Sequence, residues 1–212
     1  KAQGGGVFHL NIGQPDVTTP AVFWDAIRAY PDKVLAYGHS AGLPAYREQL
    51  AARYAAMGYE GIGPDDIVIT TGGSEAIQFA LMGICDPGDE VICFEPFYSN
   101  YNGYAAETCA RLVPVSCRPE DGYHLPPLST IAERIGPRTR ALITCTPNNP
   151  TGTVLRRDEM EQLAGLARER DLYFISDETY SDFVYDGRHT GVLALPELGA
   201  RAANAEIVRE VL

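Results

Sequence analysis

The chain has 212 residues, and its 17 Lys+Arg against 28 Asp+Glu give a formal net charge of −11 at pH 7. Hydrophobic residues make up 45% of the chain, which is too apolar for intrinsic disorder and sufficient for one large domain with a substantial core. The acidic balance argues against nucleic-acid or anionic-membrane partners, because phosphate groups require clustered cations. No apolar run approaches the roughly 20 residues that a transmembrane helix needs.

Cysteine and histidine usage indicates neither disulfides nor a metal site. The four histidines lie far apart and form no H-x-x-x-H pattern. The cysteines are odd in number and form no C-x-x-C pair, which fits reduced thiols in a cytoplasmic protein; they are Cys85, Cys93, Cys109, Cys117 and Cys145.

The N-terminus lacks the apolar region of a signal peptide, and the first residue is not Met, which indicates a trimmed sequence.

Helix and strand signals alternate along the chain. Thr19 and Pro20 predict a helix start, with the threonine as N-cap and the proline at the first helical position. Gly58 predicts the end of a second helix. We expect helices at 20–30, 44–57, 74–84, 128–135 and 158–170, and strands at 67–70, 90–94, 112–115, 141–144 and 172–176.

Short apolar strands that alternate with longer helices predict βαβ units and a largely parallel sheet. In such α/β sheets, ligands bind at the carboxyl ends of the strands. Three polar segments follow predicted strands and would gather at this edge; they are 71–74, 146–149 and 177–180.

The segment 70–76 consists of a strand end, two glycines and a helix start with a hydroxyl at Ser74. Backbone N–H groups at that helix end, together with the Ser74 hydroxyl, would form a cradle for a phosphate group. A plain capped helix after a tight turn explains the same pattern, with Glu75 in the first turn complementing the helix dipole.

Two further strand ends carry polar groups. Asn149 lies in the string Thr-Pro-Asn-Asn-Pro-Thr-Gly at 146–152, which is more specific than a generic turn. Asp177 follows an apolar strand, where a carboxylate is costly unless it meets a cation or a protonated ring nitrogen. Tyr180 could reach the same ligand. The alternative for Asp177 is a cap of the next helix.

The string Glu-Pro-Phe-Tyr-Ser-Asn-Tyr at 95–101 follows another predicted strand. An aromatic ring at this point can stack on a planar ligand. Core packing is the alternative explanation for any one of these aromatic residues.

Together these strings resemble the fold-type I pyridoxal-phosphate enzymes, specifically the class I/II aminotransferase family related to aspartate aminotransferase. The resemblance covers nearly the whole chain, begins at Asn-Ile-Gly-Gln-Pro-Asp (11–16) and keeps the family's motif order. It implies a three-layer α/β/α large domain with a mostly parallel sheet, and pyridoxal 5′-phosphate as cofactor. The implied substrates are an amino acid and a 2-oxo acid.

The resemblance also implies roles for residues that would hold the cofactor. Gly73, Ser74 and Glu75 match the phosphate-binding turn, and Tyr98 matches the aromatic residue stacked on the pyridine ring. Asn149 is similar to the asparagine that hydrogen-bonds the cofactor's 3′-oxygen beside the substrate.

Two residues would take a catalytic part. By the resemblance, Tyr180 shares the cofactor's 3′-oxygen with Asn149, and Asp177 pairs with the pyridinium nitrogen. A carboxylate in that position keeps the nitrogen protonated, so that the ring can accept electrons.

The remaining implications concern the dimer and the N-terminal segment. Tyr37 resembles the tyrosine that reaches across a homodimer to the neighbour's phosphate, and Gly13 lies where the family approaches the substrate carboxylate. We therefore expect an N-terminal segment near the substrate (1–18), a partial cofactor-binding domain (19–212) and a homodimer, the commonest oligomer.

The chain departs from the family in its lysines. Lys1 and Lys33 are its only lysines, so none follows the 177–180 motif, where the family carries its Schiff-base lysine. The family's downstream arginine for the substrate carboxylate is also absent. The chain as given is therefore expected to be inactive alone.

Two hypotheses account for the missing lysine. A lysine-bearing segment is lost near 198–203, with Arg201 as the family's phosphate-binding arginine and a helix from Asn204 to Leu212. Alternatively, the chain is truncated after a divergent loop.

The sequence is consistent with three functions. An aminotransferase is preferred; a pyridoxal-phosphate-dependent β-lyase and a non-catalytic binding module with the same fold are the alternatives. The motifs in these residues do not separate the first two, and the amino acid is not identified.

Overall fold

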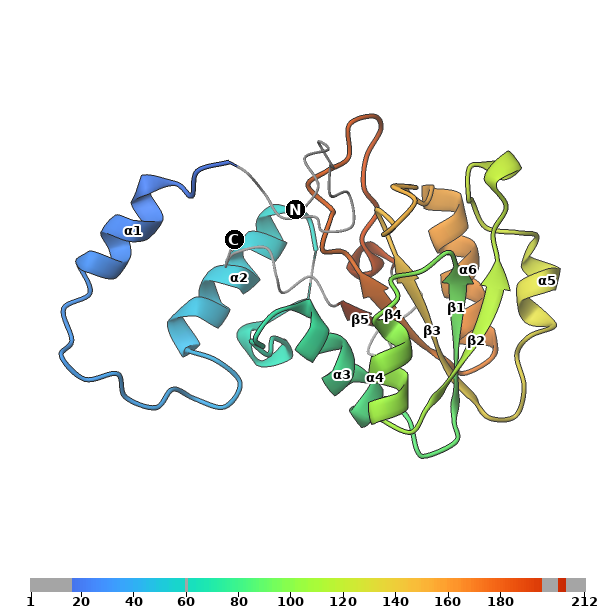
Figure 1. Cartoon of the computed structure of the whole chain (residues 1–212), viewed down its shortest axis with the longest axis horizontal. Coiled ribbons are helices and arrows are strands. Elements are labelled where there is room, and N and C mark those ends of the chain that lie inside the picture. Colours follow the sequence, from blue (N-terminus) through green and yellow to red (C-terminus); the bar gives the residue numbers. More distant parts are fainter. Residues whose placement is uncertain (1–16, 60, 196–201, 205–212) are drawn as a thin grey trace, which may run out of the picture. The chain divides into compact units, whose positions relative to one another are not determined.

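The computed structural model describes residues 17–59, 61–195 and 202–204 (Figure 1). The chain divides into two units, with the boundary between Tyr37 and Gly38. The described part of the first unit contains helix α1 (Ala21–Arg28), which has no buried residue. Pro20 is the N-cap of α1, so the prediction of Thr19 as N-cap and Pro20 inside the helix is wrong by one position.

The second unit is built on a sheet of five parallel strands in the order β2-β1-β3-β4-β5. The central strand β3 is almost entirely buried, as expected when both faces of a parallel sheet are covered. The strands are β1 (Glu90–Glu95), β2 (Arg111–Ser116), β3 (Thr139–Cys145), β4 (Tyr173–Asp177) and β5 (Ala202–Asn204).

Helices cover both faces of this sheet, so the predicted three-layer α/β/α fold is confirmed (Figure 1). Alternate residues along a strand point to opposite faces. Ile92 packs with α5 and α6, whereas Val91 packs with α3 and α4. The helices are α2 (Pro44–Ala56), α3 (Gly73–Ile84), α4 (Tyr101–Glu107), α5 (Leu128–Ala132) and α6 (Arg157–Glu169).

Most predicted elements agree with the structure to within a few residues, but the predicted strand at 67–70 is wrong. These residues have no strand pairing. The Ile69 N–H donates to the Ala41 carbonyl at 2.9 Å, and a Cβ on Gly42 would lie 2.3 Å from the Ile69 side chain. The apolar segment therefore packs against the chain before α2 instead of joining the sheet, and Val68 remains exposed.

Two regular elements were not predicted. Helix α4 has no strong apolar periodicity, and its seven residues are shorter than the pattern needed to recognise a helix. Strand β5 pairs with β4 through Ala202 to Asn204, so Asn204 does not begin a helix. The rest of the predicted C-terminal helix, Arg201 and most of 198–203 lie outside the described residues.

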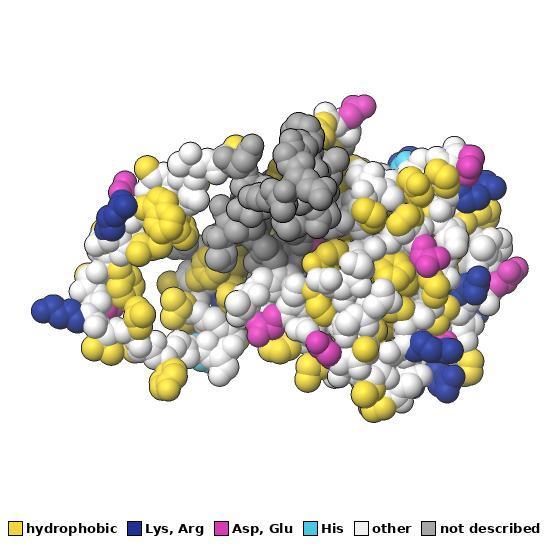
Figure 2. All heavy atoms as spheres, viewed as in Figure 1, with side chains coloured by type: hydrophobic (Ala, Val, Ile, Leu, Met, Phe, Trp, Pro, Cys, Tyr) yellow, Lys and Arg dark blue, Asp and Glu magenta, His cyan; other side chains and the backbone are white. Residues whose placement is uncertain are grey.

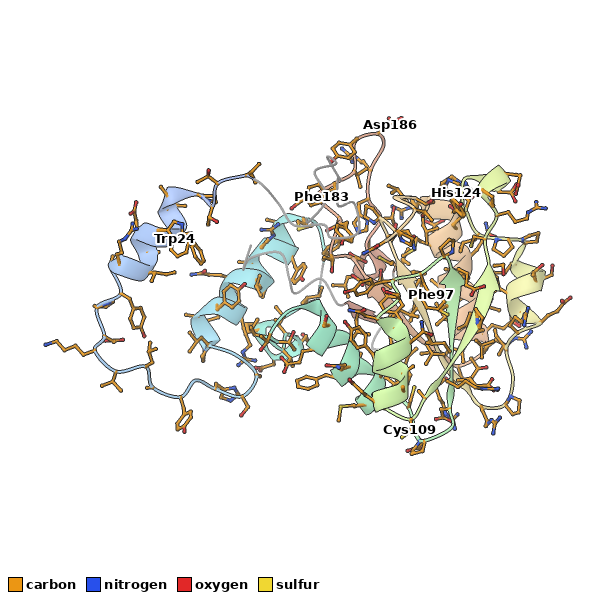
Figure 3. All side chains as sticks on the ribbon, in the orientation of Figure 1. Trp24, Phe97, Cys109, His124, Phe183 and Asp186 are labelled. Carbon is orange, nitrogen blue, oxygen red and sulfur yellow. The ribbon has the colours of Figure 1, made fainter. Side chains whose placement is uncertain are left out.

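No helix in the described part of the chain is long and apolar enough to cross a membrane. The described cysteines are all free. Burial raises the pKa of the Cys93 and Cys145 thiols to about 12, and of the Cys85 and Cys117 thiols to about 11. Cys109 lies on the surface in the turn between α4 and β2 (Figure 3).

We predict that a thiol reagent near pH 8 modifies Cys109 first, because a thiolate is the reactive form and the raised pKa of the other four keeps them protonated. Mass spectrometry of the native protein should show one rapid adduct. The Cys109→Ser variant should lose it, and rapid labelling of Cys93 or Cys145 would contradict the buried positions described above.

Candidate active site

Polar segments from three strands meet at the carboxyl edge of the sheet. They follow β1, β3 and β4, and the turn before α3 lies near the same edge because α3 packs against β4. The parallel strand direction brings these loops together from distant parts of the chain. The edge therefore holds most of the residues that the sequence analysis selected.

Asp177 is the last residue of β4, and its side chain is buried. Its Oδ2 accepts a hydrogen bond from the Tyr101 hydroxyl at 2.7 Å. Its Oδ1 accepts from the backbone N–H of Thr179 at 3.2 Å and from the Thr179 hydroxyl at 2.8 Å. Both oxygens of this buried side chain therefore accept hydrogen bonds, as a buried polar group requires.

The Tyr101 hydroxyl remains a donor because burial, together with the neighbouring Asp177 carboxylate, raises its pKa far above the usual range for a phenol. The same surroundings act on Cys145, whose pKa is raised to about 12 by burial and then by Asp177. The Tyr101 phenol and the Cys145 thiol, both next to Asp177, therefore stay protonated.

Asn149 and Tyr180 lie next to each other at the edge. The Asn149 side-chain amide donates to the Tyr180 hydroxyl at 3.3 Å. The loop that carries Asn149 is braced by Asn148, whose Oδ1 accepts from the backbone N–H of Thr151 at 3.1 Å and from its hydroxyl at 2.9 Å. The side chains of Asn149 and Tyr180 can therefore act on one ligand atom.

Tyr98 connects this pair with the N-terminus of α3. Burial raises the pKa of the Tyr98 phenol, and the nearby Tyr104, Tyr180 and Asp177 raise it further. The Tyr104 hydroxyl in turn donates to Ser74 Oγ at 2.6 Å. The structure thus brings together five predicted site residues: Ser74, Tyr98, Asn149, Asp177 and Tyr180.

The turn before α3 is shaped by glycine. Gly72 has φ of +89°, a conformation that L side chains rarely adopt, and Gly73 is buried at the first position of the helix. The first N–H groups of an α-helix have no partner within the helix, so they are available to an anion. Glu75 Oε2 accepts a hydrogen bond from the Thr71 N–H at 2.6 Å, which links the residue before the two glycines to the first turn of α3.

Two predicted site residues are not placed at this edge. Tyr37 belongs to the first unit, where its side chain is fully exposed. Gly13 lies outside the described residues. Their predicted roles stay predictions.

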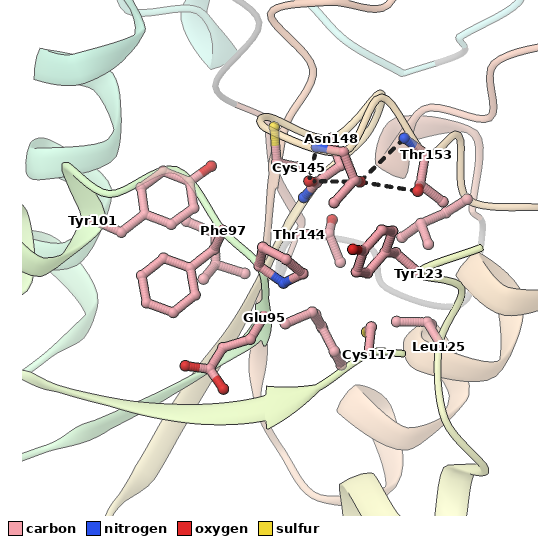
Figure 4. Close-up of a pocket in the computed structure, with 15 residues that line it drawn as sticks. Glu95, Phe97, Tyr101, Cys117, Tyr123, Leu125, Thr144, Cys145, Asn148 and Thr153 are labelled. Carbon is pink, nitrogen blue, oxygen red and sulfur yellow. Dashed lines mark hydrogen bonds between the residues drawn. The ribbon is translucent and has the colours of Figure 1, made fainter. Parts of the chain in front are cut away.

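A small cavity lies next to the site, between the ends of β1 and β3 and the loop that follows β2 (Figure 4). Tyr101, Thr144 and Asn148 are among its lining residues. Its free space is about 20 Å³, which accommodates about one water molecule and is far below the several hundred Å³ of a cofactor pocket. The cavity is not the place where a cofactor would bind.

The sequence analysis did not select Tyr101, Tyr104 or Thr179. A signal was present for the two tyrosines: Tyr101 and Tyr104 are spaced by three residues, which places both on one side of a helix. Thr179 lies two residues after Asp177, the spacing at which an Asp side chain bonds its own backbone.

Residues 6–205 match the family model described as aminotransferase class I and II. The chain belongs to the class I and II aminotransferase family. An aspartate/prephenate aminotransferase of Thermus thermophilus is 36% identical over 190 residues, which are 89% of this chain and 49% of that protein. An arginine–pyruvate transaminase of Pseudomonas aeruginosa is 35% identical over 205 residues, 95% of this chain and 51% of that protein.

Solved structures of the aminotransferase family show the same fold. An aspartate aminotransferase from Thermotoga maritima superposes with a TM-score of 0.88 at 34% identity, covering 94% of this chain and 53% of that one. The chain spans about half the length of the relatives it matches.

We predict that Tyr101→Phe lowers the free energy of unfolding of this aminotransferase-family chain by about 1–3 kcal/mol, because it removes a buried donor from the Asp177 carboxylate. Tyr185→Phe is the matched control, since the Tyr185 side chain is 93% exposed. Urea denaturation measures both variants. Equal stabilities of the two variants would show that the Tyr101 hydroxyl does not support Asp177.

Proposed function

We propose that the protein carrying this chain is a pyridoxal-phosphate-dependent aminotransferase that transfers an amino group between an amino acid and a 2-oxo acid. The observation that carries the proposal is the buried Asp177 carboxylate at the end of β4, close to the hydrogen-bonded pair of Asn149 and Tyr180. The family membership of the chain supports the same reaction class.

The donors and acceptors at the edge fit the cofactor group by group. The N-terminus of α3 with Gly73, Ser74 and the backbone of Glu75 suits the phosphate, and the half-buried ring of Tyr98 suits the flat pyridine. Asn149 and Tyr180 offer an amide and a phenol for the 3′-oxygen. When bound, pyridoxal phosphate supplies an acceptor for the electron pair released at the substrate's α-carbon.

Asp177 has a definite part in this chemistry. Its carboxylate would hold a proton on the ring nitrogen, which makes the ring a better electron acceptor. Tyr101 and Thr179 donate to the two carboxylate oxygens and so orient them. Asp177 is therefore the strongest cofactor determinant that we assign in these residues.

Transamination also needs a lysine for proton transfer at the α-carbon, and no lysine follows Lys33 in this chain. The activity is proposed for a protein in which these site residues act together with such a lysine. For this chain we propose cofactor binding and ring protonation.

The substrate class rests on the relatives. The names of these relatives contain aspartate, prephenate, arginine and pyruvate. These compounds differ in side chain, but each has an amino-acid or a 2-oxo-acid group. We therefore propose that substrate class without choosing one amino acid.

We further propose a cytoplasmic protein, because its free cysteines fit a reducing compartment.

We also propose a homodimer. Figure 2 shows apolar side chains over α1 that are open to solvent, and the large exposed ones in the first unit include Val22, Trp24, Ile27, Leu35 and Tyr37. Monomeric proteins rarely expose so many large apolar groups in one segment. In the homodimer, Tyr37 would reach the phosphate of the partner's cofactor.

In the complete enzyme, Asp177→Ala is expected to lower turnover by orders of magnitude while the fold stays intact, because the ring nitrogen loses the group that keeps it protonated. Asp186→Ala is the control, since Asp186 is exposed in a loop tip (Figure 3). Steady-state kinetics and circular dichroism measure the two effects. Near-normal turnover of Asp177→Ala would remove the assignment.

The dimer has its own test. Sedimentation of the full-length protein should give the mass of two chains, and Tyr37→Phe should weaken pyridoxal phosphate binding by removing the phenol from the partner's phosphate. Tyr30→Phe, another exposed tyrosine of the same unit, should bind normally. An active monomer would contradict the role given to Tyr37.

A further inference from the structure

Glu178 is a buried carboxylate that the proposed cofactor site does not use. It lies between Asp177 and Thr179, and its side chain is 1% exposed. Burying a charged carboxylate is costly unless hydrogen bonds compensate for the lost water. A residue of this kind inside the site motif requires an explanation.

The carboxylate of Glu178 holds a segment further along the chain. Its Oε1 accepts from the backbone N–H of Val192 at 2.7 Å, and its Oε2 lies 3.0 Å from His189 Nε2. The two atoms are within hydrogen-bond distance, and the tautomer of His189 decides which of them donates. The His189 side chain is itself nearly buried, which shields both bonds from water.

Gly191 shows how closely this segment approaches Glu178. A Cβ at Gly191 would lie 2.9 Å from Glu178 Oε2 and 2.5 Å from the hydroxyl of Tyr59, which follows α2. Both distances are shorter than real Cβ contacts, so a side chain at position 191 would require the ends of the Tyr59 and Glu178 side chains, or the backbone, to move. The segment 189–192 is thus held against the end of β4 by polar bonds and by close packing.

The residues on both sides of Glu178 carry the site. Thr179 donates a hydrogen bond to the Asp177 carboxylate, and the Tyr180 hydroxyl accepts one from the Asn149 amide. The backbone carbonyl of Glu178 accepts from the Ser181 N–H at 2.9 Å, so the turn after β4 is closed around this residue. A shift of Glu178 would displace the Thr179 cap and the Tyr180 phenol together.

We propose that Glu178 is a positioning residue: by clamping residues 189–192 to the end of β4, it holds Asp177 and Tyr180 in their cofactor-facing arrangement. This inference rests on the proposed function. We assign Glu178 no direct part in cofactor binding, because its two carboxylate oxygens contact Val192 and His189.

The test compares Glu178→Ala and Glu178→Gln with the exposed control Glu169→Ala in the protein that carries this chain. Two measurements are made: amide hydrogen exchange at Thr179 and Val192, and affinity for pyridoxal 5′-phosphate. Glu178→Ala should lose protection at both amides and bind the cofactor at least about tenfold more weakly, by analogy with the loss seen when a group that supports a metal ligand is removed. Glu178→Gln keeps an oxygen for Val192 and should recover most of both.

A role confined to local packing would give a different result. Faster exchange at Val192 alone, with Thr179 protection and cofactor affinity unchanged, would overturn the inference and leave the proposed function intact. If the unmodified protein does not bind pyridoxal phosphate, the proposed cofactor site fails, and the Thr179 amide still decides whether Glu178 positions its neighbours.

A second variant covers the case in which Glu178→Ala does not fold. Gly191→Ala keeps the carboxylate but disturbs its contact with the 189–192 segment, because the new methyl group would displace the ends of the Glu178 and Tyr59 side chains or the segment itself. It should also weaken Thr179 protection and cofactor affinity. Normal values of both in a folded Gly191→Ala protein would contradict the clamp.

Discussion

The buried carboxylate of Asp177 is the constraint on which the arrangement of the site depends. A charge at the end of a buried strand requires donors, and the surrounding chain supplies them from α4, through Tyr101, and from the turn after β4, through Thr179. The same donors fix the orientation of the carboxylate that we propose to face a protonated ring nitrogen. The stability of this edge and its proposed chemistry therefore have one physical origin.

The parallel sheet makes this arrangement possible. Because β1, β3 and β4 run in the same direction, the loops that follow them meet at one edge, and the helices on both faces keep water from the strands. The loops are then braced individually: Asn148 stabilises the turn that carries Asn149, and Glu178 binds the segment 189–192. A rigid edge with short, braced loops presents several polar groups to one ligand.

The elements that could be predicted from the sequence are those with strong apolar patterns. The buried strands β1, β3 and β4 and the amphipathic helix α6 have such patterns, and their predicted positions agree with the structure. The segment 67–70 has the same apolar character but lies beside Ala41. An apolar run indicates that residues are buried or packed, and it does not indicate which backbone they pair with.

The sequence by itself determined the class of fold and predicted polar groups at the carboxyl edge of the sheet, since positions after strands for Asn149 and Asp177 follow from pattern and motif order. Only the tertiary structure decided which groups support them. Tyr101 reaches Asp177 across 76 positions of the chain, and Glu178 meets Val192 across 14. Local periodicity carries no information about such distant pairs, because they depend on how strands are ordered and how loops return to the sheet.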